Sequence, residues 1–417
     1  MYIEPLVKHQ ARNSFTRVFL TSTVVAALLA PVSPAGFAGS PAEDHKRPLA
    51  TLALQQDIPP AAGELMRTPK IQVAIVLDTS NSMDGLIDQT RNQLWQVVNE
   101  FSSARQNGLV PILEIALFEY GNDGNSGSAG YIRMLNDFTR ELDAVSAGLF
   151  SLTTNGGSEY CGFAIDTVVN GLQWSQSSTD IKTIFIAGNE SFAQGPVNYR
   201  EATKLARENG ISVNTIHAGG HETGVRDQWQ AGALLAGGDY MSIDADQQVV
   251  HIVAPQDERI AELNARLNQT YIPYGSAGKE SAQRQMEQDA LSSEISAGLL
   301  AKRAASKTSD FYSNSNWDLV DALNDGEVTA QALERLADEA LPESMSGLSA
   351  QEKLHYVQEK ARQREQIKHE ISELSRSRAA YVAEQKHARA AAAPSMSDAL
   401  TGAIRKQARL KKFSFAN

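Results

Sequence analysis

The feature that most constrains the fold is an almost continuous apolar run at residues 71–77, Ile-Gln-Val-Ala-Ile-Val-Leu. A run of this kind, without regular polar alternation, is typical of a strand buried on both faces of a parallel sheet. The period then changes, because apolar residues recur at helical spacing from Ile87 to Phe101. We therefore expect a helix that ends near Gly108, before Pro111.

The alternation of strand and helix patterns continues to about residue 243. Further strands are expected over residues 112–120, 131–138, 181–186, 211–216 and 240–243, and helices over residues 142–152, 162–172 and 199–209. This order predicts a doubly wound α/β fold, in which a mostly parallel sheet has helices on both faces. In such a sheet the ligand site lies where strands end and helices begin.

A different pattern follows the expected α/β domain, 70–255. Ala, Glu, Gln, Lys and Arg dominate the rest of the chain, so 256–417 is predicted to be an α-helical C-terminal region. Ser349-Ala-Gln-Glu352 has the form of a capping box and predicts a long charged helix over about 349–385. We expect that helix to pack within the chain, and we hold an intermolecular coiled coil as the alternative.

Basic residues in two places bear on that region. Arg364 and Arg378 interrupt the apolar stripe of the long helix, so it is not a strict heptad. The basic tail from Arg405 to Lys412 is expected to be a solvated end.

The N-terminus has the pattern of an export signal. A basic stretch ends at Arg17, an apolar core spans Val18–Ala30, and small residues follow up to Ala38. This predicts a signal peptide over 1–38 and a linker over 39–69. The protein is therefore expected in the periplasm or secreted, with no stable membrane span after cleavage.

The overall composition limits the partners. The chain has 417 residues, 42% of them hydrophobic, which is enough for one main domain with helical additions. Its formal net charge of −11 argues against nucleic acid, whose binding depends on basic patches. An acidic surface suits a cation better.

The loop after the first strand carries the clearest chemical signal, Asp78-Thr-Ser-Asn-Ser-Met83. It places one carboxylate and the hydroxyls of Ser80 and Ser82 at the carboxyl edge of the sheet. These are hard oxygen ligands, and Mg²⁺ prefers such ligands in octahedral geometry with several waters retained. A site of this kind leaves positions open for an outside ligand. Mg²⁺ is the expected ion, with Mn²⁺ or Ca²⁺ as alternatives.

The D-x-S-x-S pattern after the first strand resembles the von Willebrand factor A (vWA) family and its metal-ion-dependent adhesion site (MIDAS). The resemblance covers residues 70 to about 250. It implies that the two serines and a later threonine bind the metal directly or through water, and that a later Asp adds a carboxylate. It also implies a protein partner whose acidic side chain completes the coordination. The function implied is adhesion or complex assembly by an exported, non-enzymatic protein.

Two further loops contain the remaining candidate ligands. Residues 153–159 read Thr-Thr-Asn-Gly-Gly-Ser-Glu and offer Thr154, Ser158 and Glu159, although capping of a helix is an alternative role for the first two. The third loop is Ala-Gly-Asn-Glu at 187–190. Gly stands where the family has its acidic residue, so Asn189 or Glu190 would have to take its place.

Two other functions stay open from the sequence. A structural protein of the bacterial envelope could act through its C-terminal helices with a degenerate metal site, and Gly188 favours that interpretation. A hydrolase that uses Cys161 is less favoured, because nothing in the sequence pairs this residue with His217 or His221 and a small buried Cys is commoner. No catalytic base or nucleophile accompanies the expected metal, so we do not expect an enzyme.

Overall fold

The computed structural model describes residues 67–81, 83–243, 251–388 and 396–415. These residues belong to one unit of the chain, Glu64–Asn417. The expected signal peptide and the expected linker up to residue 66 lie outside the described residues. Among the residues that are described, no helix is both long enough and apolar enough to cross a membrane.

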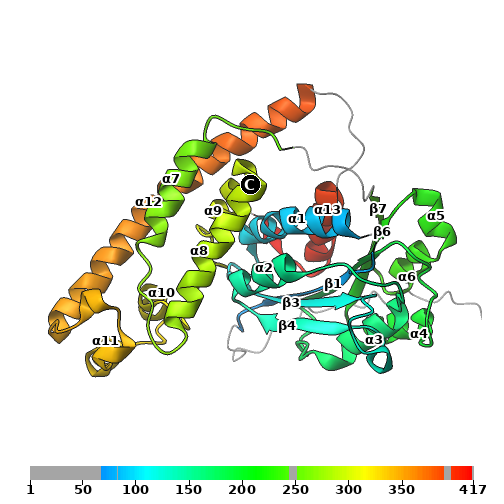
Figure 1. The fold of residues 1–417 in the computed structure, drawn as a ribbon, viewed down its shortest axis with the longest axis horizontal. Coiled ribbons are helices and arrows are strands. Elements are labelled where there is room, and N and C mark those ends of the chain that lie inside the picture. The colour runs from blue at the N-terminus through cyan, green and yellow to red at the C-terminus, as the bar shows by residue number, and fades with distance from the viewer. Residues whose placement is uncertain (1–66, 82, 244–250, 389–395, 416–417) are drawn as a thin grey trace, which may run out of the picture. The chain divides into compact units, whose positions relative to one another are not determined.

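The sheet at the centre of the α/β domain has six strands in the order β4-β3-β1-β5-β6-β7 (Figure 1). They are β1 Lys70–Asp78, β3 Ile112–Tyr120, β4 Arg133–Thr139, β5 Ile181–Gly188, β6 Ser212–Ala218 and β7 Tyr240–Ile243. All neighbours are parallel except β3 and β4. The predicted α/β class with a mostly parallel sheet is therefore confirmed.

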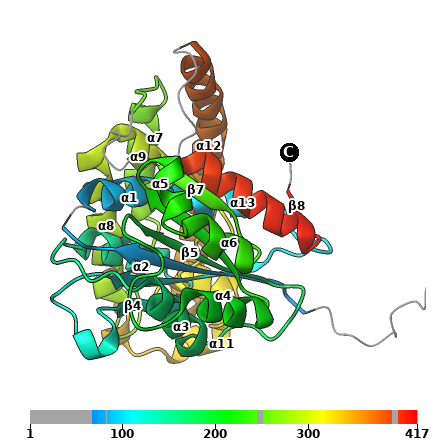
Figure 2. The same ribbon diagram turned by 90° about the vertical axis from the view of Figure 1, so that its right-hand side faces the viewer.

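Helices cover both faces of the sheet, as Figures 1 and 2 show from two sides. On one face lie α1 Asp84–Ser102, α2 Leu142–Ser151 and α13 Met396–Leu410, and on the other lie α3 Cys161–Gly171 and α4 Tyr199–Glu208; α5 His221–Arg226 and α6 Trp229–Leu235 precede β7. Strand β1 serves two cores, because Val73 packs with α1 and α2 whereas Val76 packs with α3 and α4. Burial on both faces accounts for its continuous apolar run.

A small second sheet was not expected from the sequence. Helix α1 ends at Ser102, short of the predicted Gly108, and the chain then forms β2, Ala104–Arg105. Strand β2 pairs antiparallel with β8, Ser414–Phe415, near the end of the chain. A strand of two residues has no periodicity that a sequence pattern can reveal.

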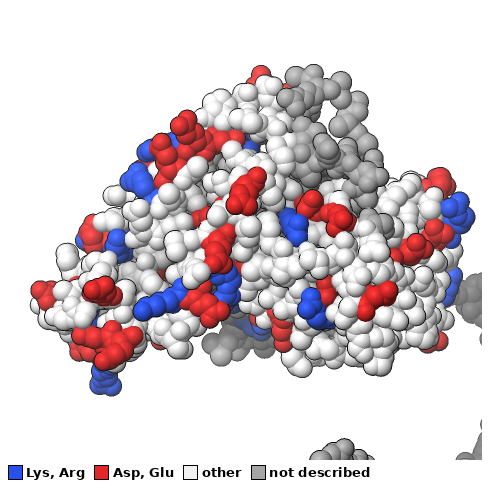
Figure 3. Space-filling model, in the orientation of Figure 1, with Lys and Arg blue, Asp and Glu red and all other residues white. Residues whose placement is uncertain are grey.

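The C-terminal region is helical and packs on the α/β domain. Its helices are α7 Asp257–Asn268, α8 Gly278–Ile295, α9 Ala297–Ser306, α10 Leu319–Asn324, α11 Ala330–Arg335 and α12 Ala350–Ala388. Helix α9 packs against α1 and α8 against α2, while α12 packs against α7, α9, α10 and α11. On the face seen in Figure 3, acidic and basic side chains are interspersed over these elements.

The capping box that predicted α12 is present. The backbone N of Ser349 donates to Glu352 Oε2 at 2.8 Å, and the backbone N of Glu352 donates to Ser349 Oγ at 3.4 Å. Arg364, which interrupts the apolar stripe, is only 1% exposed in its side chain and forms ion pairs with Asp318 and Asp321. The packing of α12 within the chain therefore depends on this arginine.

The prediction of a solvated basic tail is wrong. Residues 405–410 belong to α13, and Ile404, Ala408 and Phe413 are buried in the core on the α1 side of the sheet. Two of its basic side chains pair with acids of the α/β domain, Arg405 with Glu100 and Lys406 with Asp239. These partners are distant in the sequence, which is why the local charge suggested a free end.

Candidate metal site at the carboxyl edge of the sheet

The first loop holds its acidic residue in a fully buried position. Asp78 is the last residue of β1 and is 0% exposed, and Ser80 is 2% exposed. The backbone N of Ser80 donates to Asp78 Oδ1 at 2.8 Å. Asp78 Oδ2 and Ser80 Oγ are buried without a hydrogen-bond partner among the described residues. Buried oxygens of this kind are costly unless a donor or a cation compensates them.

The second loop brings another carboxylate to the same place. Glu159 is 3% exposed, and its Oε2 accepts a hydrogen bond from the backbone N of Glu190 at 3.3 Å. A Cβ atom on Gly121 would lie 2.7 Å from Asp78 Oδ1 and 3.0 Å from Glu159 Cγ. Glycine at 121, which follows β3 with φ +78°, therefore lets the two acidic side chains approach.

The electrostatics of the two acids reflect this burial. Burial raises the pKa of Asp78 above its ordinary value, although hydrogen bonds from its surroundings oppose the change. Burial and the neighbouring Asp78 carboxylate raise the pKa of Glu159 to about 9. Two carboxylates this close can relieve their repulsion by holding one proton between them. A dication bound by both would displace that proton and do the same.

Gly188 has a steric explanation. A Cβ at this last position of β5 would lie 2.3 Å from Tyr120 Oη and 3.0 Å from Asp78 Oδ2. Tyr120, which is 0% exposed, donates from Oη to the backbone oxygen of Ala187 at 3.1 Å. No side chain fits at 188, so the second carboxylate at this edge comes from Glu159 in the second loop.

The other candidate residues lie around Asp78, Ser80 and Glu159. Thr154 Oγ1 donates to Asp84 Oδ1 at 3.0 Å, so its hydroxyl is engaged with the first turn of α1. Ser158 is half-buried beside Glu159. Glu190 is exposed, and its backbone oxygen accepts from Trp229 Nε1 at 2.7 Å. Ser82 lies outside the described residues.

Asn189 contributes to the site through its backbone. Its backbone N–H acts on Asp78, where it opposes the rise in the pKa. Its backbone oxygen lies 3.2 Å from Nε2 of His217, a buried residue of β6. The structure therefore brings together the side chains of Asp78, Ser80 and Glu159 with the backbone of residues 189 and 190.

Reciprocal hydrogen bonds, which the sequence does not reveal, tie the first two loops together. The backbone N of Asn81 donates to Gly156 O at 3.1 Å, and the backbone N of Gly156 donates to Asn81 Oδ1 at 3.2 Å. The backbone N of Asn155 donates to Thr79 O at 2.9 Å. Gly156 has φ +83°, a conformation that favours glycine and lets the loop turn back to the first one.

Cys161 lies behind the site. It is 1% exposed, and its Sγ is 3.5 Å from Tyr120 Oη. Burial raises the pKa of the thiol above its ordinary value, although the contact with Tyr120 acts in the opposite direction. A catalytic cysteine reacts as the thiolate, so this environment disfavours a Cys-dependent hydrolase.

The side chains at this edge offer oxygen ligands to a divalent ion. Among the described residues no group of three or more His, Cys, Asp or Glu side chains could hold a metal. The site instead offers two carboxylates and a hydroxyl, and the unpartnered Asp78 Oδ2 and Ser80 Oγ are oxygens that a cation could use. These hard ligands suit Mg²⁺, Mn²⁺ or Ca²⁺.

Comparisons with known proteins return similar folds only. No family model matches the sequence, and no curated protein matches it. Similar solved structures include the conserved hypothetical protein BatB from Bacteroides thetaiotaomicron, at 16% identity and a TM-score of 0.32 over 42% of this chain and 90% of that one. The VWA domain of SpRpn10 is similar at 14% identity and a TM-score of 0.31, over 44% of this chain and 100% of that one.

A third similar structure is proximal thread matrix protein 1 from the mussel byssus, with zinc in its MIDAS motif. Its identity is 11% and its TM-score 0.32, over 43% of each chain. Likenesses of this size cover less than half of the chain and do not decide its function. The α/β assignment above depends on the sheet itself.

Proposed function

We propose that the carboxyl edge of the sheet binds a divalent cation through Asp78, Ser80 and Glu159, and that the chain uses this ion to hold another protein. The proposal depends chiefly on one observation: Asp78 Oδ2 and Ser80 Oγ are buried beside a second buried carboxylate and have no hydrogen-bond partner in the part of the chain that the structure describes. Mg²⁺ is the ion proposed first, with Mn²⁺ or Ca²⁺ as alternatives. Further candidate ligands are Ser82, Thr154, Ser158, Asn189 and Glu190.

The proposed chemistry is binding rather than catalysis. Two carboxylates balance the charge of a dication, and a Mg²⁺ ion keeps several of its waters. An acidic side chain of a partner protein would then replace water. Glu190, which is exposed at the rim, is placed to influence which acidic groups approach. We include export in the proposal, because of the signal pattern over residues 1–38.

Calorimetric titration of Mg²⁺, Mn²⁺ and Ca²⁺ into the full chain tests the ion. We expect saturable binding by the wild type and none by Asp78→Ala. The matched control is Asp88→Asn, because Asp88 is an exposed acid of α1 that pairs with Arg91. Equal loss in both variants, or no binding by the wild type, would contradict the metal site. Circular dichroism checks that each variant is folded.

Capture of the partner is a separate test. A pull-down from an envelope extract, with and without a chelator, should recover the same protein with wild type only when the ion is present. Asp78→Ala should lose it to the same extent as chelation. If the wild type keeps its partner without any divalent ion, adhesion through this edge is wrong.

One observation favours a second candidate, in which the helices do the binding. From Ser375 to Gln385 no side chain of α12 is fully buried. That end of the helix contributes little to the core and is open to a partner, as expected of an assembly protein that acts through its C-terminal helices. Replacing the exposed Arg376 and Glu384 of this end by Ala, which keeps α13 and its core contacts, should remove capture under this alternative and leave it intact under the metal-dependent one.

A further inference from the structure

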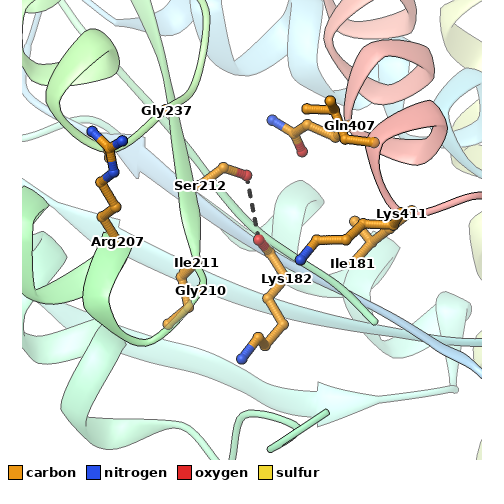
Figure 4. Close-up of a pocket in the computed structure, with 11 residues that line it drawn as sticks. Ile181, Lys182, Arg207, Gly210, Ile211, Ser212, Gly237, Gln407 and Lys411 are labelled. Carbon is orange, nitrogen blue, oxygen red and sulfur yellow. Dashed lines mark hydrogen bonds between the residues drawn. The ribbon is translucent and has the colours of Figure 1, made fainter. Parts of the chain in front are cut away.

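Strands β5 and β6 have different surroundings at their two ends. Where they begin, Lys182, Arg207 and Lys411 line a cavity of about 180 Å³, and Figure 4 shows their charged groups directed to different places. Where the strands end, His217 of β6 is the parallel neighbour of Gly188 of β5, directly before the third loop of the candidate metal site. Only at this second end do the side chains act on a common target, the backbone of that loop.

His217 is buried and its ring is directed at the third loop. It is 1% exposed, and its Nε2 lies 3.2 Å from the backbone oxygen of Asn189. A carbonyl oxygen only accepts hydrogen bonds, so Nε2 carries the proton and donates it. A Cβ atom on Gly219 would lie 2.7 Å from Cε1 of the ring, and one on Gly224 would lie 2.7 Å from its Cγ. Glycine at both positions therefore leaves the room that this ring orientation needs.

The peptide unit between Asn189 and Glu190 transmits this contact to the site. A trans peptide is planar, and its C=O and N–H groups point in opposite directions. The oxygen of this unit accepts from His217, and its N–H, which belongs to Glu190, donates to Glu159 Oε2 at 3.3 Å. His217 and Glu159 are thus joined by two hydrogen bonds in series through one peptide. Hydrogen bonds in series polarise one another, so each strengthens the other.

Trp229 holds the next carbonyl group of the same loop. It is 0% exposed, and its Nε1 donates to the backbone oxygen of Glu190 at 2.7 Å. Its ring contacts His217 and Phe192, with 5.8 Å and 4.9 Å between the ring centroids. Two buried aromatic side chains, one from β6 and one from α6, therefore fix the oxygens of two successive residues.

We propose that His217 is a positioning residue of the candidate metal site, with Trp229 as its support. It holds the peptide of residues 189–190 so that the N–H of Glu190 fixes the carboxylate of Glu159 for a cation. That Glu159 binds an ion rests on the proposed function, whereas the placement of the peptide does not. Groups that orient a metal ligand without touching the metal typically change its affinity about 10–100-fold when they are lost.

The first measurement is amide hydrogen exchange at Glu190 in the full chain, with chelator present. His217→Met removes the donor but keeps a long apolar side chain, so exchange at Glu190 should become about tenfold faster. His217→Gln, whose amide N–H can take the place of Nε2–H, should restore slow exchange. The amides of Ile184 and Ile186, within β5, should exchange as in wild type in both variants.

The second measurement is calorimetric titration of Mg²⁺. His217→Met should bind about 10–100-fold more weakly than wild type, and His217→Gln should recover most of that loss. Trp229→Phe keeps an aromatic ring and should also weaken binding, which provides a second test should His217→Met not fold. Its matched control is Trp174→Phe, because Trp174 Nε1 likewise donates to a backbone oxygen, that of Val168 at 3.2 Å, in the connection from α3 to β5. The control should keep wild-type affinity.

Faster exchange confined to Glu190 in His217→Met, with recovery in His217→Gln, supports the positioning role even if wild type binds no ion. Absence of ion binding by wild type would then count against the proposed function alone. The inference is overturned if exchange at Glu190 is unchanged in His217→Met, if the β5 amides accelerate equally, or if His217→Gln behaves like His217→Met. It is also overturned if wild type binds Mg²⁺ and His217→Met binds it as tightly, or if Trp174→Phe loses as much affinity as Trp229→Phe.

Discussion

Among the described residues, two clusters of buried carboxylates have opposite electrostatic surroundings. In the helical region Asp289 lies between Arg303 and Lys307, both of which form ion pairs with it. At the carboxyl edge of the sheet Asp78 and Glu159 are equally buried, but no ion pair within the described residues joins either of them to a cation. The first arrangement is complete within the chain, whereas the second is balanced only by a proton or by something the chain binds.

The acidities follow the same contrast. Burial alone would raise the pKa of Asp289, but Lys307 and Arg303 outweigh it and hold that pKa below its usual range. Burial and Asp78 together raise the pKa of Glu159 to about 9. Burial is similar in the two regions, so the presence of a cation decides the direction. We therefore interpret the helical cluster as structural and the sheet edge as a site for a ligand.

The largest expected effect is in the helical cluster. Arg303→Met leaves Asp143 and Asp289 short of a buried partner and should lower the free energy of unfolding by about 3–5 kcal/mol, as is usual when one member of a buried pair is removed. Denaturant unfolding at neutral pH measures it. Arg259→Met removes an exposed ion pair and should leave the midpoint unchanged. A loss below about 1 kcal/mol for Arg303→Met would place the cluster among weak surface pairs.

At the carboxyl edge of the sheet, removal of a buried charge should change the free energy of unfolding in the opposite direction. Without divalent ions Asp78→Asn removes an uncompensated buried charge, so the free energy of unfolding should stay the same or rise. With an ion at a hundred times its Kd, the wild type should gain about 2.7 kcal/mol and the variant nothing. Thermal unfolding with and without chelator measures both. If Asp78→Asn were destabilised in chelator as strongly as Arg303→Met, the contrast between the regions would fail.

A more gradual effect concerns pH. The folded-state pKa of Glu159 is raised above its unfolded value, so in chelator its stabilising, protonated form is fully present below about pH 4.5 and is lost as the pH rises towards 9. Stability should therefore fall across this window, by at most about 1.4 kcal/mol per pH unit, and Glu159→Gln should flatten the slope. Unfolding curves at pH 5, 7 and 9 give the comparison. If the slope of unfolding free energy against pH were unchanged in Glu159→Gln, another titrating group would be responsible for the pH dependence.

At low pH the helical cluster should show the opposite dependence, with stability lost as the pH falls. The folded-state pKa of Asp289 is below its unfolded value, so its contribution is present above about pH 4 and is lost as the pH falls below that. This loss should occur in wild type and in Glu159→Gln alike. Asp289→Asn should abolish it, although that variant starts from a lower stability. If Glu159→Gln no longer lost stability below about pH 4, the two regions would not be independent.

The sequence could predict features that depend on local pattern. The apolar run of β1 indicated a strand with two buried faces, and Ser349 with Glu352 indicated the start of α12. Asp78 and Ser80 were found in the same way, because their loop follows a recognisable strand. Each of these depends on residues that are neighbours along the chain.

Features that depend on distant partners could not be predicted. Arg364 looked like an interruption of α12, because Asp318 and Asp321 are 46 and 43 residues away. The choice among Thr154, Ser158 and Glu159 depends on the turn at Gly156, which fixes the side chain that faces Asp78. In each case the missing information is a contact between segments.

The smallest effect compares two buried serines. Ser306 is 0% exposed, and its Oγ donates to Asn99 Oδ1 at 2.9 Å, so Ser306→Ala leaves this half-buried acceptor without its donor and should cost about 1 kcal/mol. Ser80 Oγ has no hydrogen-bond partner among the described residues, so Ser80→Ala should leave the stability in chelator unchanged. The same substitution should still lower the affinity for the ion, but less than Asp78→Ala does, because water can replace one neutral oxygen around a hydrated cation. Unfolding in chelator and calorimetry with Mg²⁺ separate the two effects. If Ser80→Ala cost as much stability as Ser306→Ala and left ion affinity intact, its hydroxyl would be an ordinary part of the core and the proposed ligand set would lose it.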